Sequence, residues 1–219
     1  MSRSAGDNMQ AGSVYARYSM HMDLTHPIRT LAPGLTGAVL EVLARTPHPL
    51  SGRAVQRRVS RPASQAGVQK TLDRLADTGL VRQISVGRAV LNELNRDHAL
   101  ASSVLEVVEM DETVPVRIAA LVRAHAPGVS RALLFGSLAR REARADSDVD
   151  LLLVWPDSID RLVRWSAAAD IAVAVTRLTG NPCIPLVYTD DEYSGLPERA
   201  PEFAASLDRE AIDLLSSAA

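Results

Sequence analysis

The stretch LLFGSLARREARADSDVDLLLV, residues 133–154, joins two apolar runs through a glycine-serine turn and a short charged segment. The first run predicts a strand that delivers Gly136 and Ser137 to the start of a short helix. Backbone N–H groups and a hydroxyl at such a position can hold phosphate oxygens. Gly136 leaves room for that approach because it has no Cβ. This half of the stretch predicts a phosphate-binding turn.

Two aspartates, Asp148 and Asp150, stand at the start of the second apolar run. Residues two apart on a strand point to the same side, so the strand presents both carboxylates together. Like charges this close repel unless a cation lies between them. Hard oxygen ligands suit Mg²⁺ or Mn²⁺, which complete their shells with water and substrate phosphates. The pattern favours a metal-bound nucleotide over its plainer alternative, a solvated acidic loop.

The spacing resembles the motif of the minimal nucleotidyltransferases of the DNA polymerase β superfamily, in which G-S is followed by ten residues and then D-x-D. Here the ten residues are 138–147, and the resemblance covers Ser130 to about Leu215. It implies an α/β (α+β) domain with a small mixed sheet that binds a nucleoside triphosphate. Its implied catalytic metal ligands are Asp148 and Asp150. Its implied phosphate-binding residues are Gly136 and Ser137. Arg140 and Arg141 lie between the two elements and are further nucleotide-binding candidates that can offset triphosphate charge, the alternative being solvated arginines on a short exposed helix.

The sequence departs from the family pattern at one position. Active members place a third carboxylate on a later strand, in the setting apolar, Asp, apolar, apolar. The corresponding stretch here is IPLV, residues 184–187, which puts Pro185 at the acidic position. Proline neither binds metal nor accepts a proton. One of Asp190, Asp191 or Glu192 can replace the missing acid only by folding back into the site.

Residues 35–94 follow a different pattern. Apolar periodicity predicts a helix from Leu35, a second from an N-cap at Ser51 to about Val59, and a third over about 63–77. A hairpin is expected over 80–94, with its turn at Gly87-Arg88. This order resembles the winged helix-turn-helix of bacterial regulators, over roughly 33–95. The resemblance implies that the third helix enters the major groove of DNA while the hairpin lies near the phosphates.

Charge is unevenly distributed along the chain. Residues 45–96 carry an excess of Lys and Arg, whereas residues 97–219 carry an excess of Asp and Glu. A basic surface that coincides with a DNA-binding fold favours DNA as a partner. The alternative is a solvated face on a protein-binding domain. The candidate DNA-binding residues are Gln65, Gln69, Lys70, Arg74, Arg58, Arg61 and Arg88.

The 219 residues are enough for two modest domains. The expected divisions are a poorly ordered leader over 1–26, a winged helix-turn-helix over 27–96, a helical connector over 97–127 and a nucleotidyltransferase-like domain over 128–219. The connector can support a homodimer. The single cysteine, Cys183, excludes an internal disulfide and fits the cytoplasm. No run is long enough to span a membrane.

Three functions fit these features. The first is a DNA-binding transcriptional regulator whose second domain binds a nucleoside triphosphate with a divalent metal as an effector. The second is an active enzyme that transfers a nucleotidyl group to a protein or RNA hydroxyl. The third is an antitoxin-like protein that masks or modifies a small helical ribonuclease. The intact G-S and D-x-D elements support all three, and Pro185 argues against turnover.

Overall fold

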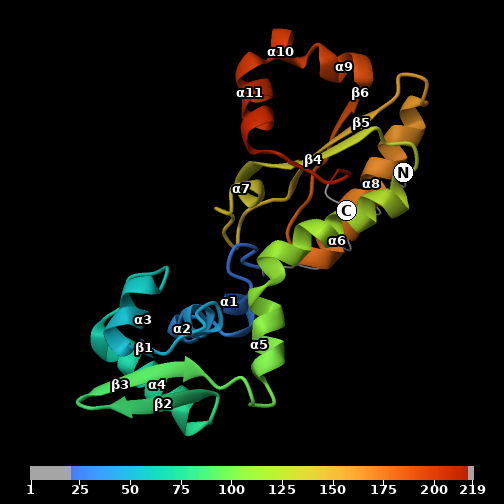
Figure 1. The fold of residues 1–219 in the computed structure, drawn as a ribbon. Coiled ribbons are helices and arrows are strands. Elements are labelled where there is room, and N and C mark those ends of the chain that lie inside the picture. Colours follow the sequence, from blue (N-terminus) through green and yellow to red (C-terminus); the bar gives the residue numbers. More distant parts are fainter. Residues whose placement is uncertain (1–20, 217–219) are drawn as a thin grey trace, which may run out of the picture.

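The computed structural model describes residues 21–216 as two domains joined by a pair of helices (Figure 1). The joining helices are α5, Ala101–Val108, and α6, Met110–His125. They follow each other with only Glu109 between them. The N-terminal domain lies at one end of this pair and the C-terminal domain packs along α6.

The N-terminal domain contains α1 (Ile28–Leu31), α2 (Leu35–Ala44), β1 (Leu50–Ser51), α3 (Gly52–Arg58), α4 (Gln65–Asp77), β2 (Val81–Val86) and β3 (Ala89–Leu94). Its antiparallel sheet has the order β1-β3-β2. The Ser51 hydroxyl accepts a hydrogen bond from the Ala54 N–H and caps α3, while Ser64 caps α4 through Gly67. The helices and the hairpin that the sequence predicts are therefore present.

The C-terminal domain contains β4 (Arg131–Phe135), α7 (Gly136–Ala139), β5 (Asp150–Trp155), α8 (Arg161–Thr179), β6 (Leu186–Thr189), α9 (Asp190–Ser194), α10 (Leu196–Arg199), α11 (Pro201–Glu210) and β7 (Ile212–Asp213). The strand order is β6-β5-β4-β7. Strand β4 is antiparallel to β5 and β7, and β5 is parallel to β6. The small mixed sheet expected from the sequence is confirmed.

The sheet of the C-terminal domain lies between two layers of helices (Figure 1). Leu151, Leu153 and Trp155 of β5 are fully buried in the cluster that contains α6 and α8. The alternate residues, Leu152 and Val154, belong to a second cluster with α10 and α11. This alternation assigns Asp150 to the face that α10 and α11 cover.

Helix α6 differs from the expected connector in two ways. It begins at Met110 rather than at Pro115, which lies inside the helix. Val114, Ile118 and Val122 are buried in the C-terminal core, and this packing offsets the main-chain hydrogen bond that Pro115 cannot donate. Helix α6 is thus an integral layer of the C-terminal domain, whereas α5 packs on the N-terminal core through Val104 and Val108.

The last elements of the chain are a helix and a short edge strand. Helix α11 ends at Glu210, and Ile212 and Asp213 form β7 on the free edge of β4. Because β7 pairs Ile212 with Leu134, the end of α11 lies beside the end of β4. This pairing brings Glu210 close to the glycine-serine turn.

The expected leader falls largely outside the described residues, but its end, residues 21–26, is packed. Leu24 is fully buried in the C-terminal core, and Ile28, four residues later, is buried in the N-terminal core. Burial of the Leu24 side chain removes apolar surface from water and favours an ordered segment. Among residues 21–216, none of the helices combines the length and apolar character that crossing a bilayer requires.

Candidate functional site

The glycine-serine turn and the aspartate pair meet at one end of the four-stranded sheet. Phe135, the last residue of β4, pairs with Asp150, the first residue of β5. Gly136 has a φ of 71°, and a Cβ added there would lie 2.9 Å from the carboxylate carbon of Asp150. Glycine is therefore needed both for the backbone conformation and for the space that the carboxylate occupies.

Asp150 is held in an unfavourable electrostatic environment. Burial raises its pKa above the ordinary value, the charge of Asp148 raises it further, and the charge of Arg140 opposes both. The effect of Asp148 on this pKa indicates that the two carboxylates lie close to each other. The arrangement is therefore ready to accept a cation.

Cys183 lies beside the aspartate pair but takes no part in its chemistry. It forms a parallel bridge with Val149 and is buried in the core. Burial and the charges of Asp150 and Asp148 raise the pKa of its thiol to about 12. The thiol is therefore neutral at physiological pH, and neither a nucleophile nor a metal ligand is expected there.

The remaining predicted nucleotide-binding residues lie on or next to α7. Ser137 is half-buried, and its hydroxyl has no hydrogen-bond partner within residues 21–216. The Arg140 guanidinium donates to Glu142 at 2.9 Å and to Glu210 at 3.1 Å. These two hydrogen bonds raise the pKa of Arg140. A triphosphate must therefore compete with two glutamates for this arginine.

Arg141 has a different orientation from Arg140. Its backbone is left-handed, with a φ of 58°, and its guanidinium lies 3.6 Å from the carboxylate of Glu112 on α6. The structure thus brings together Gly136, Ser137, Arg140 and the aspartate pair, and it turns Arg141 toward α6. Sequence patterns gave no signal for Glu210, because its approach depends on the β7 pairing.

Strand register shows which residues could have supplied a third carboxylate. The parallel pairing of Leu152 with Leu186 and the bridge between Val149 and Cys183 place Ile184 beside Asp150. Paired residues of neighbouring strands point to the same face, so the relevant positions are Ile184 and Leu186 rather than Pro185. Both are apolar, and residues 21–216 contain no cluster of three metal-binding side chains.

The acidic residues after β6 lie at the other end of the sheet. Thr189 pairs with Trp155, the last residue of β5, so α9 begins where β5 ends. Asp190 accepts a hydrogen bond from Ser130, and Glu192 forms a capping box with Thr189. The hypothesis that Asp190, Asp191 or Glu192 folds back into the site is therefore wrong.

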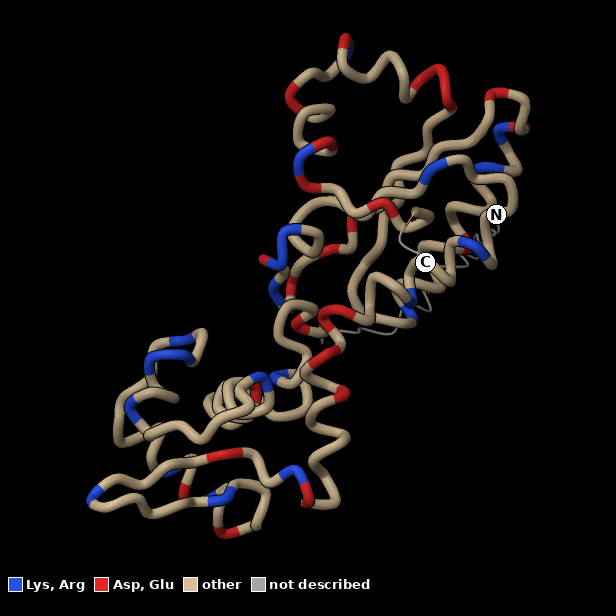
Figure 2. Tube along the Cα trace, in the orientation of Figure 1, with Lys and Arg blue, Asp and Glu red and all other residues tan. Residues whose placement is uncertain are grey.

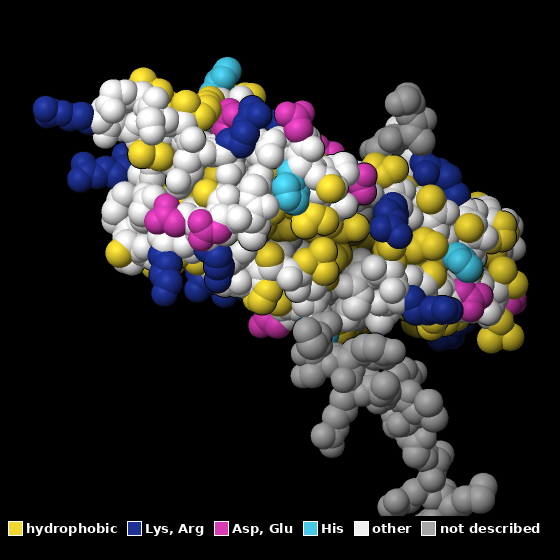
Figure 3. Space-filling view, turned by 90° about the horizontal axis from the view of Figure 1, so that it is seen from below, with side chains coloured by type: hydrophobic (Ala, Val, Ile, Leu, Met, Phe, Trp, Pro, Cys, Tyr) yellow, Lys and Arg dark blue, Asp and Glu magenta, His cyan; other side chains and the backbone are white. Residues whose placement is uncertain are grey.

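The N-terminal domain carries a basic surface at the end remote from the C-terminal domain. Lys and Arg gather along α3 and at the tip of the β2–β3 hairpin, and their side chains project from this end (Figures 2 and 3). Lys70, Arg58, Arg61 and Arg88 are exposed and form no ion pair within the described chain. Gln65 at the start of α4 is also exposed.

Three of the predicted DNA-binding side chains form hydrogen bonds within the domain, one of them from Arg58 to the Ala54 carbonyl at 3.4 Å. Gln69 donates a hydrogen bond to Asp73 at 2.8 Å, and Arg74 donates to the hydroxyl of Thr36. Asp73 also places a negative charge on the exposed face of α4. The side chains available to an external phosphate are thus those of Lys70, α3 and the hairpin tip.

The family comparison agrees with this geometry. Residues 117–182 match the family described as polymerase beta, nucleotidyltransferase. A solved structure of a minimal nucleotidyltransferase is 33% identical and covers 47% of this chain and 93% of its own, with a TM-score of 0.35. A toxin–antitoxin structure with AMP-PNP is 20% identical and covers 46% of this chain and 71% of its own, with a TM-score of 0.33.

A third similar structure is the tri-AMPylated HEPN toxin of Shewanella oneidensis in complex with MNT antitoxin. It is 18% identical and covers 48% of this chain and 71% of its own, with a TM-score of 0.31. Among the curated proteins, none matches this chain significantly.

Proposed function

Because this chain carries a nucleotidyltransferase domain of the polymerase beta family, we propose that it binds a nucleoside triphosphate with Mg²⁺ or Mn²⁺ at the end of its C-terminal sheet. The observation that carries the proposal is the contact between Gly136 and the Asp150 carboxylate, beside Asp148. The turn and the acidic pair are otherwise separated by a charged loop, and the fold brings them together.

The residues at this point fit a metal-bound nucleotide. Asp148 and Asp150 are hard oxygen donors whose mutual repulsion a divalent cation would relieve. The space above Gly136 is occupied by the Asp150 carboxylate, so the absence of a Cβ lets this carboxylate lie directly against the turn. A bound cation would supply positive charge to the triphosphate.

Each side chain has a distinct role in this proposal. Asp148 and Asp150 hold the cation, and the Ser137 hydroxyl with the N–H groups at the start of α7 holds phosphate oxygens. Arg140 moves from Glu142 and Glu210 to the triphosphate, since a polyphosphate carries more negative charge than either carboxylate. Arg141 stays paired with Glu112 of α6 and makes no direct contact with the nucleotide.

The test is a thermal-shift measurement with each of the four nucleoside triphosphates and Mg²⁺ or Mn²⁺. Binding to the folded state raises Tm by mass action. We expect a metal-dependent increase with wild type and none with Asp148→Ala/Asp150→Ala. The matched control is Asp190→Asn/Asp191→Asn, which removes acidic charge from the other end of the sheet and should keep the increase. No metal-dependent shift with any nucleotide would refute the proposal.

We propose further that the N-terminal domain binds DNA and that the nucleotide serves as its effector. Support comes from the cations on α3 and the hairpin tip that form no ion pair among residues 21–216. Each phosphate that a protein neutralises steepens the salt dependence of its DNA affinity by about one unit of slope. Fluorescence anisotropy with duplex DNA should therefore show a shallower slope for Arg61→Ala and Arg88→Ala. Unchanged slopes in both variants would contradict DNA binding by this surface.

Nucleotidyl transfer to a protein or RNA hydroxyl is the second candidate. It is favoured by the intact Gly136–Ser137 and Asp148/Asp150 elements, and disfavoured by the apolar residues at Ile184 and Leu186. The discriminating measurement is pyrophosphate release with Mn²⁺ and protein or RNA acceptors. Release that disappears in Asp148→Ala would establish transfer and replace the effector role.

A further inference from the structure

Residues 22–29, here called the interdomain segment, belong to the cores of both domains. Leu24 is fully buried among α6, α8 and the C-terminal sheet, whereas Ile28 is buried against α2. Only three residues separate these two anchors. A displacement of the segment at one domain is therefore transmitted to the other over a very short length of chain.

Asn181 connects this segment to the loop that carries the metal ligands. Its side chain is completely buried, and its amide donates hydrogen bonds to the carbonyls of Ser147 at 2.9 Å, Met22 at 3.2 Å and Ala145 at 3.4 Å. Its side-chain carbonyl accepts from the Met22 N–H at 3.1 Å. Ser147 immediately precedes Asp148. One side chain thus holds both the loop before the aspartate and the start of the interdomain segment.

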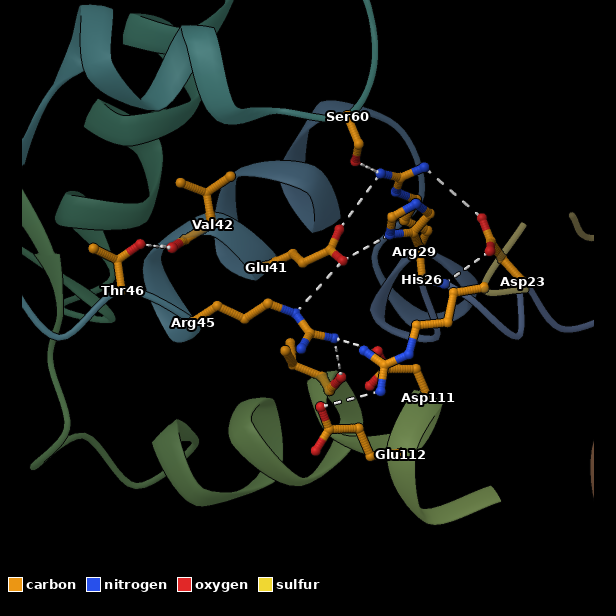
Figure 4. A network of polar contacts seen from close by, with 12 residues as sticks. Asp23, His26, Arg29, Glu41, Val42, Arg45, Thr46, Ser60, Asp111 and Glu112 are labelled. Atoms are coloured by element: carbon orange, nitrogen blue, oxygen red, sulfur yellow. Dashed lines mark hydrogen bonds and ion pairs between the residues drawn. The ribbon is translucent and has the colours of Figure 1, made fainter. Parts of the chain in front are cut away.

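The other end of the segment joins a network of charged side chains (Figure 4). Asp23 accepts a hydrogen bond from the His26 N–H at 2.8 Å and lies 3.8 Å from Arg29. Arg29 and His26 in turn contact the Glu41 carboxylate of α2 at 3.4 and 2.7 Å. Polar contacts therefore run from Asn181 to the first long helix of the N-terminal domain.

The network also reaches the domain joint. Arg45 of α2 donates hydrogen bonds to Asp111 at 2.8 Å and to the carbonyl of Val108 at 2.9 Å, at the break between α5 and α6 (Figure 4). Glu112, the next residue of α6, pairs with Arg141 just after the glycine-serine turn. The loop between the glycine-serine turn and Asp148, residues 141–147, is therefore linked at both ends to side chains that contact α2 or the residue that follows it. The link runs through Glu112 at residue 141 and through Asn181 at residue 147.

We propose that Asn181 is a positioning residue for Asp148 and that it couples the nucleotide site to the N-terminal domain through the interdomain segment. The proposal rests on the proposed nucleotide site. Drawing Asp148 and Asp150 around a cation shifts the 145–147 loop, and Asn181 passes the shift to Met22. By linkage, any change at Arg29 or Glu41 that alters the segment must alter affinity at the site.

The test measures the affinity for each nucleoside triphosphate with Mn²⁺ by calorimetry. We expect Asn181→Ala to weaken binding about tenfold or more, because Asp148 is no longer held in place. Arg29→Ala changes no residue of the nucleotide site, and we expect it to weaken binding several-fold. Asn181→Asp retains the acceptor for Met22 but cannot donate to Ser147, and it should lose affinity as Asn181→Ala does.

The matched control is Asn92→Ala in the hairpin of the N-terminal domain. Asn92 is also buried, and it donates a hydrogen bond to the Leu50 carbonyl at 3.1 Å, so its removal costs stability without touching the interdomain segment. Its nucleotide affinity should equal that of wild type. Wild-type affinity in Asn181→Ala or in Arg29→Ala would overturn the proposal.

A second readout separates this proposal from the proposed function. If wild type binds no nucleotide, the proposed function fails, and the coupling is then judged by amide hydrogen exchange. Arg29→Ala should raise exchange over residues 144–150 relative to Asn92→Ala. Equal exchange in the two variants would refute the coupling on its own.

Discussion

Glu41 and Asp150 are both carboxylates withdrawn from water, yet their surroundings are opposite. Burial tends to raise the pKa of Glu41, but a hydrogen bond from His26 and the charges of His26, Arg29 and Arg45 outweigh it and hold the pKa below the ordinary 4.5. Burial also raises the pKa of Asp150, and there the nearest strong influence is another carboxylate, Asp148. The protein compensates the charge of the first group and leaves that of the second without comparable compensation.

The difference separates a carboxylate that is compensated within the protein from one that we propose binds a cation. Glu41 contacts two arginines and a histidine and fixes α1 to α2 (Figure 4). Among residues 21–216, the counter-charge of Asp150 comes from Arg140 alone, and the Arg140 guanidinium already donates to two glutamates. A perturbed pKa in a group without adequate internal compensation is the more informative sign of function.

The largest effect is expected on removing the charge of Glu41. Glu41→Gln leaves Arg29 and Arg45 without their shared counter-charge in a mostly buried site, and should lower the free energy of unfolding by about 3 kcal/mol. Urea unfolding measures the loss. The control, Glu106→Gln, removes an exposed glutamate of α5 that forms no ion pair within the described residues. Equal stability of both variants would show that the network is not stabilising.

Gly136→Ala is expected to act at Asp150. An alanine at this position must adopt a left-handed backbone conformation, and its Cβ must displace the Asp150 carboxylate. The two effects together should lower the free energy of unfolding by about 2 kcal/mol. Gly128→Ala is the matched control, because Gly128 has a φ of 79° with no atom within 4 Å of an added Cβ. A larger loss for Gly136→Ala isolates the carboxylate contact. Equal losses would mean that backbone strain alone makes glycine necessary.

Local patterns were sufficient to predict most of the helices and strands and the meeting of the glycine-serine turn with Asp150. The hairpin over residues 81–94, the cap at Ser51 and the Gly136 to Asp150 motif depend on neighbours within a few residues or on a short fixed spacing. Each of these features needs a particular residue type at a particular position, and the sequence shows that residue directly. Period-two alternation predicted both aspartates on the strand, but β5 begins at Asp150, and Asp148 lies two residues before it, next to the bridge residue Val149.

Contacts between distant segments could not be predicted. Asn181 and Met22 are 159 residues apart, and Glu210 meets Arg140 only because β7 pairs with β4. Nothing in the sequence distinguishes Leu24 from other apolar residues near the N-terminus. The expectation that Pro185 occupies the position of the third carboxylate was wrong by one residue, because the strand register places Ile184 beside Asp150. A single sequence does not provide this register.

The pH dependence of stability should differ in sign at the two carboxylates. The lowered pKa of Glu41 contributes stability above its ordinary pKa, and this contribution is lost as the pH falls through the folded pKa. The stability difference between wild type and Glu41→Gln should therefore shrink from pH 7 to pH values below about 4. The decrease with pH in this stability difference cannot be larger than the difference measured at pH 7. A difference that stays constant over this range would contradict the prediction.

The pKa shift of Asp150 changes stability with pH in the opposite direction, and its expected effect is the smallest of those considered. Its raised pKa contributes stability below its ordinary value, and that contribution is lost as the pH rises through the folded pKa. At pH 7 the metal-free protein thus carries a repulsion that Asp148→Asn removes, and the variant should be more stable by about 0.5 kcal/mol, since solvent screens the exposed Asp148. Urea unfolding at pH 7 in the presence of a chelator measures the difference.

Asp146→Asn is the control for this variant, because Asp146 is exposed and forms no ion pair within residues 21–216. It should leave stability unchanged. Addition of Mn²⁺ should stabilise wild type more than Asp148→Asn, because only wild type retains both carboxylates. A loss of stability in metal-free Asp148→Asn would show that the protein already compensates Asp148, as it does Glu41, and the distinction between the two sites would fail.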